Sequence, residues 1–386
     1  MKISIGMITN KLQSSNPILK FLENAKKFGH TIDRVIMTCS TGADERTVRA
    51  IREKVSLSII DLNRPQYLEE QLRQRGISSQ AAQTLLTVSA HGPNGRVPYG
   101  FNRNQVLMEA ILKNIDILIF VDSDVIPSVL TLSNGELVLE EIDFVGEHLA
   151  SLMGGAQITT SEYSGYNILP PARFDGMDDL LIGLQKDDLR SYWEQSDTHH
   201  CIMTQAQAGP LEPCTKVLGG NAGFRLEVFS VMPPFYSPYY TADDGYYLAR
   251  GEDTVLSLAL KPNGITCTNI QTMIFHDTYK NYPKRPDLIH DASTQERFYY
   301  ACTGWIGRNP FYNYLLGGDP QEVRELQRRH LASGASALAE YTSNPRFLTL
   351  PDKLEISWNN LERYIREYNR LMDAWSEFAA KVFRQA

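Results

Sequence analysis

The chain has 386 residues, of which 42% are hydrophobic and 22% are charged, and its formal net charge is -7 at pH 7. These values are ordinary for a globular protein, and the length exceeds what one core usually serves, so about two domains or one elaborated domain are expected. The negative balance argues against nucleic acid as the main partner, because that role usually requires a basic surface.

Cysteine usage and the N-terminal residues bear on the compartment. The five cysteines are scattered and form no C-x-x-C pair, so neither a zinc site nor a disulfide framework is indicated. The start, MKISIGMITNKL, has no apolar core of signal-peptide length, and no run reaches the ~18 apolar residues of a membrane span. We therefore expect a cytoplasmic protein without a transmembrane segment, while peripheral contact with a membrane stays open.

Strand and helix patterns alternate over the first third of the chain. Strands are predicted at ISIGMIT, IDRVIMTC, VSLSIIDL and DILIFVDSD, and helices at NPILKFLENAKKFG, ADERTVRAIREK and NRNQVLMEAILKNI. Strands separated by helices indicate an α/β domain with a parallel sheet. Ligands of such sheets bind outside the carboxyl ends of the strands.

The later chain has a different character. Residues 151–300 are rich in Gly, Pro and Tyr, which favours long loops over a substrate-contacting surface. Residues 301–386 are predicted to be helical, with one helix from an acidic cap to Gly334 and a longer one near 355–384. The apolar spacing of the longer helix favours packing onto the main domain or onto a dimer partner over membrane binding.

An acidic pair follows the last of the early strands. Asp122 and Asp124 come directly after ILIFV, and charges at the end of a buried strand are costly without a partner. Carboxylate oxygens suit Mg²⁺ or Mn²⁺, which usually keeps waters and takes other ligands from substrate phosphates. His276 follows another apolar strand and is a plausible third ligand, although a lone His is more often structural. Alone, D-x-D is also typical of solvated loop acids.

Two further stretches could contact an anionic or polar ligand. Arg103, in YGFNRNQVLMEAI, stands at a helix start, which is a natural anion site. In LGGNAGFRLEVF, Gly219 and Gly220 let backbone approach a ligand closely, and Asn221 can hydrogen-bond it.

A second acidic pair begins an apolar helix. Glu252 and Asp253 stand in YYLARGEDTVLSLAL, where capping and the helix dipole alone would also favour acids. Weaker candidates for metal, acceptor or sugar contacts are His199, His200, Asp243, Asp244 and Trp305.

In their order along the chain, these motifs resemble those of nucleotide-sugar-dependent glycosyltransferases of the GT-A fold, in particular the large family 2 group. The shared motifs are G-x-x-R-N, D-x-D, G-G-N-x-x-F-R, G-E-D and a late His, and they cover roughly residues 1–280. The resemblance implies a Rossmann-like, mostly parallel central sheet flanked by helices, with a helical C-terminal extension. Residues 1–150 would bind the nucleotide sugar, and residues 151–300 would bind the acceptor.

The resemblance also implies roles on the donor side. Asp124 would bind Mn²⁺ or Mg²⁺ directly, with His276 as an additional ligand. Asp122 would lie near the metal or the donor ribose, and Arg103 would contact the nucleotide or its phosphates. A UDP-sugar is the favoured donor, and a GDP-sugar is the alternative.

On the acceptor side, the same resemblance implies that Asp253 is the general base of an inverting hexosyl transfer to a saccharide or other hydroxyl acceptor. Glu252 would orient donor or acceptor hydroxyls, and Gly219, Gly220 and Asn221 would line the junction of donor sugar and acceptor. Retaining GT-A enzymes share the metal site but not the base, so retention stays open.

Other classes fit the residues less well. A sugar-nucleotidyltransferase would show a Gly-rich, Arg-containing loop after the first strand, and ITNKLQSSN contains no glycine. A glycoside hydrolase would not need a metal site at the end of a parallel strand. A non-enzymatic carbohydrate-binding module would lack metal or base residues. A homodimer through the C-terminal helices stays open.

Overall fold

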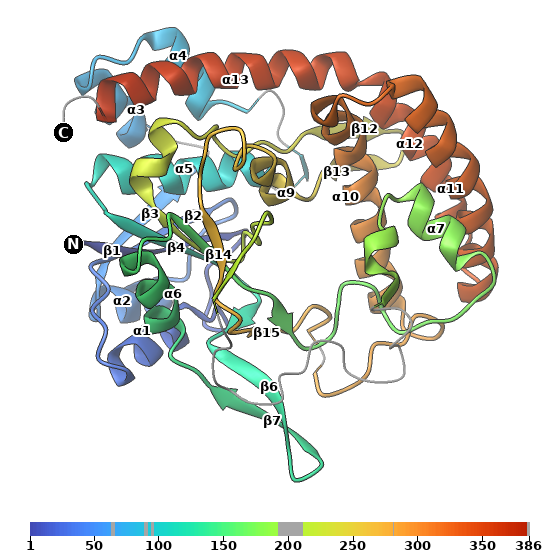
Figure 1. The fold of residues 1–386 in the computed structure, drawn as a ribbon, viewed down its shortest axis with the longest axis horizontal. Coiled ribbons are helices and arrows are strands. Elements are labelled where there is room, and N and C mark those ends of the chain that lie inside the picture. Colours follow the sequence, from blue (N-terminus) through green and yellow to red (C-terminus); the bar gives the residue numbers. More distant parts are fainter. Residues whose placement is uncertain (63–65, 89–91, 94–95, 192–210, 281, 384–386) are drawn as a thin grey trace.

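The computed structural model describes residues 1–62, 66–88, 92–93, 96–191, 211–280 and 282–383. A sheet flanked by helices lies on one side of the molecule, a group of helices lies on the other, and a long helix, α13, runs between them along the top of Figure 1. We call the two sides the sheet lobe and the helical lobe. The helices of the helical lobe and the connecting helix are α7 (Met177–Gly183), α10 (Ala292–Leu316), α11 (Pro320–Thr342), α12 (Leu350–Asn359) and α13 (Leu361–Val382).

The main sheet of the described chain has eight strands in the order β10-β14-β8-β11-β4-β1-β2-β3. Strands β4, β1, β2 and β3 are parallel to one another, β11 is antiparallel to both β4 and β8, and β14 is parallel to β8. The α/β prediction is therefore confirmed, and strands from residues 151–300 complete the same sheet. The strands are β1 (Ile3–Thr9), β2 (Arg34–Cys39), β3 (Ser56–Asp61), β4 (Ile117–Asp122), β8 (Ile158–Thr160), β10 (Glu212–Pro213), β11 (Asn221–Arg225) and β14 (Cys267–Asn269).

Strand β4 explains why its sequence is a continuous apolar run. Successive side chains of a strand point to opposite faces, and both faces of this sheet are covered. Ile119 and Val121 pack in the core under α1 and α6, whereas Leu118 and Phe120 pack in the core under α5 and α13. The covering helices are α1 (Ile18–Lys27), α2 (Glu45–Arg52) and α6 (Phe144–Met153) on one face, and α3 (Gln66–Gln74), α4 (Ser79–Leu86) and α5 (Tyr99–Leu112) on the other.

Small sheets join the main sheet to the helical lobe. Short strand β15 pairs with β5 and β9 beyond the end of β4, and the β6–β7 hairpin projects at the lower edge of Figure 1. Helix α9 (Glu252–Ser257) follows the β12–β13 hairpin. These strands are β5 (Val125–Ile126), β6 (Ser128–Ser133), β7 (Glu136–Glu141), β9 (Tyr163–Ser164), β12 (Tyr239–Ala242), β13 (Gly245–Leu248) and β15 (Ile274–His276).

The predicted C-terminal helices are present, with two corrections. The Asp319 side chain caps α11 as expected by accepting from the backbone N–H of Gln321 at 2.8 Å, but the helix does not end at Gly334. A Cβ at Gly334 would collide with the backbone of Leu180 in α7, so this glycine serves the close packing of two helices. The expected helix near 355–384 is two helices, α12 and α13, which meet at Asn360.

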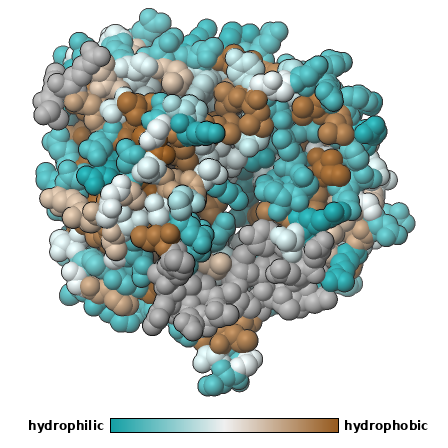
Figure 2. Space-filling view, viewed as in Figure 1, coloured by the Kyte–Doolittle hydropathy of each residue, from teal (hydrophilic) through white to brown (hydrophobic). Residues whose placement is uncertain are grey.

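Helix α13 packs onto the sheet lobe, as one of the two predicted alternatives required. Trp375 and Phe378 are buried in the core that contains Phe120. None of the described helices combines the length and the apolar character needed to cross a bilayer. Figure 2 shows the hydrophobic residues of one face as separate spots among hydrophilic ones.

Candidate active site

Asp124 and His276 lie together at the carboxyl end of the parallel strands. β4 ends at Asp122, and the two residues that follow lead into β5. Strand β15 runs antiparallel to β5 and sets His276 opposite Val125, next in the chain to Asp124. The imidazole Nε2 is therefore 3.3 Å from the Asp124 carboxylate Oδ2. The sheet thus brings together two predicted site residues that are far apart in sequence.

The Asp124 carboxylate is held in its ionised form. Burial raises the pKa of this carboxyl, but the positive charges of His276, Arg297 and Lys280 outweigh that effect and hold the pKa well below its usual range. Arg297 reaches it from α10, with Nη2 at 3.6 Å from Oδ2. Asp124 can therefore act as an anionic ligand at neutral pH.

The pair fits a divalent cation held by few protein ligands. The Nε2 atom of His276 is buried and makes no hydrogen bond of normal geometry to any residue of the described ranges, although it faces Asp124. Within the described ranges, no three His, Cys, Asp or Glu side chains converge on one point as a metal cluster. Mg²⁺ and similar ions commonly use one or two protein ligands together with waters and substrate phosphates, so a two-ligand site is chemically adequate.

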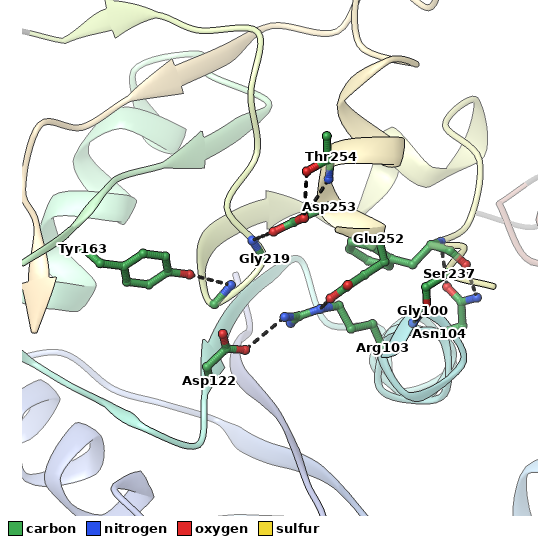
Figure 3. A network of polar contacts seen from close by, with 12 residues as sticks. Gly100, Arg103, Asn104, Asp122, Tyr163, Gly219, Ser237, Glu252, Asp253 and Thr254 are labelled. Carbon is green, nitrogen blue, oxygen red and sulfur yellow. Dashed lines mark hydrogen bonds and ion pairs between the residues drawn. The ribbon is translucent and has the colours of Figure 1, made fainter. Parts of the chain in front are cut away.

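Asp122 forms an ion pair with Arg103, and its predicted place near the metal or the donor ribose stays a prediction. Figure 3 shows Arg103 between Asp122 and Glu252, with Nη2 at 3.0 Å from Asp122 Oδ1 and Nε at 2.7 Å from Glu252 Oε1. Burial lowers the pKa of Arg103, but the charges of Glu252 and Asp122 outweigh it and raise the pKa above its usual range. The guanidinium also lies over the rings of Phe120 and Phe235, at 5.2 and 6.0 Å from their centroids.

Arg103 is almost fully enclosed in the wall of the cavity. It is 3% exposed, and its Nη1 is buried without a hydrogen-bond partner in the described chain. The structure thus gives it two carboxylates to hold in place, and its predicted contact with donor phosphates stays a prediction. Glu252 is 6% exposed, so its carboxylate depends on Arg103 for its charge balance.

Replacing Arg103 by methionine should destabilise the fold by about 3–5 kcal/mol, because it leaves the buried Glu252 carboxylate without its counter-charge. The double variant Arg103→Met/Glu252→Gln should recover a large part of this loss, since both charges are then absent. The free energies of unfolding in urea of the wild type, Arg103→Met, Glu252→Gln and the double variant form a double-mutant cycle that measures this recovery. Equal stability of Arg103→Met and the wild type would contradict the bridging role.

Asp253 joins the start of α9 to the glycine turn that precedes β11. Its Oδ2 accepts from the backbone N–H of Gly219 at 2.8 Å, and its Oδ1 accepts from that of Thr254 at 2.7 Å (Figure 3). The helix begins after Gly251, whose φ of +89° suits glycine far better than other residues. The carboxylate is thus held at the cavity wall by two backbone donors, in the predicted neighbourhood of Gly219.

The remaining residues of the glycine turn are used inside the protein. Gly220 donates its N–H to the Tyr163 hydroxyl at 3.1 Å, and a Cβ at Gly220 would collide with Asp122. Burial and the nearby Asp122 and Asp253 carboxylates raise the pKa of Tyr163 well above its usual value, so the phenol stays protonated. Tyr163 belongs to the site although no sequence motif marks it.

Asn221 is fully buried and does not line the cavity. Its amide nitrogen donates to the carbonyl of Ser161 at 3.1 Å, and its Oδ1 lies 3.1 Å from Nε2 of His148. Burial lowers the pKa of His148 to about 4, so the ring is neutral and its Nε2–H donates to Asn221 while Nδ1 accepts from Thr159. Asn221 therefore holds β11 against its neighbours, in place of the expected contact with donor sugar.

One cavity of about 410 Å³ is lined by the acidic and basic residues described above, namely Arg103, Asp122, Asp124, Glu252, Asp253 and His276. Its wall includes Trp305, one of the weaker sequence candidates. Basic residues from separate parts of the chain also line it, and sequence reasoning missed them because they share no motif: Lys186, Lys216, Arg250, Lys280, Arg297 and Arg308. A second cavity of about 500 Å³ beside Phe101 and Tyr236 contains none of the predicted site residues.

Asp243 and Asp244 are not among the residues that line this cavity. Asp244 contacts Lys353 and accepts from the Tyr247 hydroxyl at 2.7 Å, and Asp243 is exposed. His199 and His200 lie outside the described residues.

Comparisons with known proteins add three solved structures. No protein-family model matches the chain, and no curated protein sequence does. Glucosyl-3-phosphoglycerate synthase from Mycobacterium tuberculosis, in complex with Mn²⁺, UDP and glucosyl-3-phosphoglycerate, is 17% identical over 73% of this chain and 73% of that chain, with a TM-score of 0.36. The same enzyme with Mn²⁺ and UDP-glucose is 15% identical over 80% and 78%, with a TM-score of 0.37. A mycobacterial protein is 13% identical over 88% and 75%, with a TM-score of 0.35. These values are too low to assign an activity.

Proposed function

We propose that the protein is a metal-dependent glycosyltransferase that moves a sugar from a nucleoside diphosphate sugar to a hydroxyl acceptor. The observation that carries the proposal is the arrangement of two kinds of acidic group around one cavity. Asp124 stands with His276 at the carboxyl end of the parallel strands, whereas Asp253 stands apart on α9. One group suits a cation, and the other suits proton transfer.

The donor side is the part of the cavity around Asp124. Asp124 and His276 would hold Mn²⁺ or Mg²⁺, which when bound supplies a Lewis acid for the diphosphate leaving group. Arg297 and Lys280, whose charges act on Asp124, are placed to attract the diphosphate. Polar residues beyond Asp122 offer hydrogen bonds for a nucleoside, and these are Thr9, Asn10 and Asn102. A UDP-sugar is the donor we favour.

The acceptor side is the part of the cavity around Asp253. We assign its carboxylate as the general base that takes the proton of the acceptor hydroxyl as that oxygen attacks the anomeric carbon. The two backbone N–H groups that hold it at Gly219 and Thr254 fix its position. Attack from the face opposite the departing diphosphate inverts the anomeric configuration, and it needs no covalent intermediate.

A panel of nucleotide sugars tests this proposal. The full chain is incubated with each UDP- and GDP-sugar, and nucleotide release is measured with Mn²⁺, with Mg²⁺ and with EDTA. We expect release from one donor class that requires the metal and stops on chelation. Release that is unaffected by EDTA would contradict the metal site, and the absence of release from every donor would contradict the proposed class.

A further inference from the structure

The cavity carries a charge opposite to that of the whole chain. Among the residues that the structure describes, seven basic side chains and four carboxylates line it, whereas the formal net charge of the protein is -7. Three of the carboxylates already have basic partners, since Arg103 holds Asp122 and Glu252 and Arg297 lies near Asp124. A bound divalent cation would offset most of the charge of a donor diphosphate. The remaining positive charge of the cavity therefore exceeds the charge that is needed to bind the proposed donor.

Two of the basic side chains that line the cavity lie at separate places along α10. Arg297 and Arg308 are eleven residues apart in this helix, which corresponds to about 16 Å along the axis at the rise of an α-helix. Arg297 faces Asp124 at the donor side. Arg308 lies beside the turn that leads to Asp253, since a Cβ at Gly251 would be 3.2 Å from its Nη1. The second group of charges thus adjoins the proposed base.

Arg308 is a buried cation that forms no ion pair within 4.0 Å in the part of the chain that the structure describes, although the Asp253 and Asp188 carboxylates act on it from farther away. It is 5% exposed, its Nη2 donates to Asn309 at 3.2 Å, and its Nε has no hydrogen-bond partner among the described residues. Its guanidinium also lies over the Tyr312 ring, at 5.1 Å from the centroid. A buried charge of this kind is costly unless a counter-ion completes the site.

Two lysines extend the same basic group. Lys186 lies 5.7 Å from the Trp305 ring centroid, and its side chain is 13% exposed. Burial and the charges of Arg308 and Lys216 lower the pKa of Lys186, which places the three cations within electrostatic reach of one another. Its Nζ pairs at 3.1 Å with Asp188, whose side chain is 56% exposed, so this carboxylate is largely solvated. Lys216 is exposed at the cavity rim.

We propose that Arg308, Lys186 and Lys216 form an anion-binding subsite, and that the acceptor is a hydroxyl compound which also carries a phosphate or carboxylate group. The assignment of the anion to an acceptor rests on the proposed function, whereas anion binding at these three residues does not. Arginine binds both groups through paired hydrogen bonds. An anion held at Arg308 places a neighbouring hydroxyl close to Asp253, so the subsite selects the acceptor and orients it for deprotonation.

Calorimetric titration of the full chain with inorganic phosphate, and separately with acetate, tests the subsite. We expect at least one of the two anions to bind the wild type. Loss of one charge-assisted contact should weaken that binding about tenfold in Lys186→Gln and more in Arg308→Gln. Lys216→Gln should weaken it less, because Lys216 is exposed. Tight phosphate with weak acetate identifies a phosphorylated acceptor, and the reverse identifies a carboxylate.

Arg366→Gln is the matched control, since Arg366 lies outside the cavity on α13 and is 62% exposed. Thermal melting checks that each variant folds, and the two lysine variants keep the test decisive if Arg308→Gln does not fold. Binding that is absent in the wild type, or equal in the wild type and both lysine variants, overturns the subsite. Weakened anion binding without release of nucleotide from any sugar donor would overturn the glycosyltransferase proposal alone.

Discussion

Replacing Asp253 with asparagine should lower the rate of sugar transfer by about 10²–10⁴-fold, the contribution typical of a general base. Asparagine has nearly the same shape and can still accept one of the two backbone hydrogen bonds from Gly219 and Thr254. Binding of the nucleoside diphosphate with Mn²⁺ should therefore change little. Steady-state rates and calorimetry of the purified variant measure the two effects separately.

Two controls separate a base from a residue that only positions the glycine turn. Asp373→Asn changes an exposed aspartate on α13 and should transfer at the wild-type rate. In Asp253→Ala, added formate should restore part of the rate, because a small carboxylate can occupy the vacated space, whereas a purely structural role would not be rescued. Full activity of Asp253→Asn would remove Asp253 from the mechanism.

Replacing Asp124 with asparagine should lower metal-dependent nucleotide release by at least about 10²-fold, because a Lewis acid contributes several kcal/mol to the stability of the transition state. The variant keeps the size of the side chain and loses the anionic ligand beside His276. Electron paramagnetic resonance of Mn²⁺, titrated with the protein and UDP, gives a readout that does not depend on turnover. Bound Mn²⁺ should fall in Asp124→Asn and remain at the wild-type level in Asp373→Asn.

His276→Gln provides the companion measurement. Loss of the imidazole ligand should weaken Mn²⁺ binding less than loss of the Asp124 carboxylate does, since the carboxylate contributes both a bond and an opposite charge. If both variants bind Mn²⁺ with wild-type affinity, the cation does not bind at Asp124 and His276. Full nucleotide release by Asp124→Asn in the presence of EDTA would contradict metal dependence altogether.

The architecture of the sheet lobe could be predicted because the local patterns are strong. The strand ILIFV is buried on both faces, so its residues are continuously apolar, and the acids that follow must then lie at a carboxyl edge. The order of strands and helices limited the possible connections further. The closeness of Asp124 to His276 followed from this edge, although the pairing of β15 with β5 that creates it has no short-range signal.

Contacts between distant segments could not be predicted from the sequence. Nothing near Arg103 indicates that its partners are Asp122 and Glu252, because Glu252 stands on α9, 149 residues farther along the chain. Gly334 reads as a helix stop and instead allows α11 to touch α7, since the space available to a side chain depends on the neighbouring helix.

The contacts of single Asn and Cys side chains could not be predicted from the sequence either. Asn221 was expected in the cavity because its neighbours are glycines, but strand alternation turns it toward His148. The Sγ atoms of Cys214 and Cys267 lie 3.1 Å apart as free thiols, brought together where the residue after β10 meets β14. Their separation in the chain gave no indication of this.

Real-time NMR of one turnover mixture tests the central claim most directly. The full chain is incubated with Mg²⁺, the donor selected by the nucleotide panel and an acceptor, and the anomeric proton signals are followed. We predict that the donor signal decays as a product signal of the opposite anomeric configuration grows, at equal rates. A product of unchanged configuration would contradict the assignment of Asp253 as the base, and decay of the donor without any glycosylated product would contradict transfer to a hydroxyl acceptor.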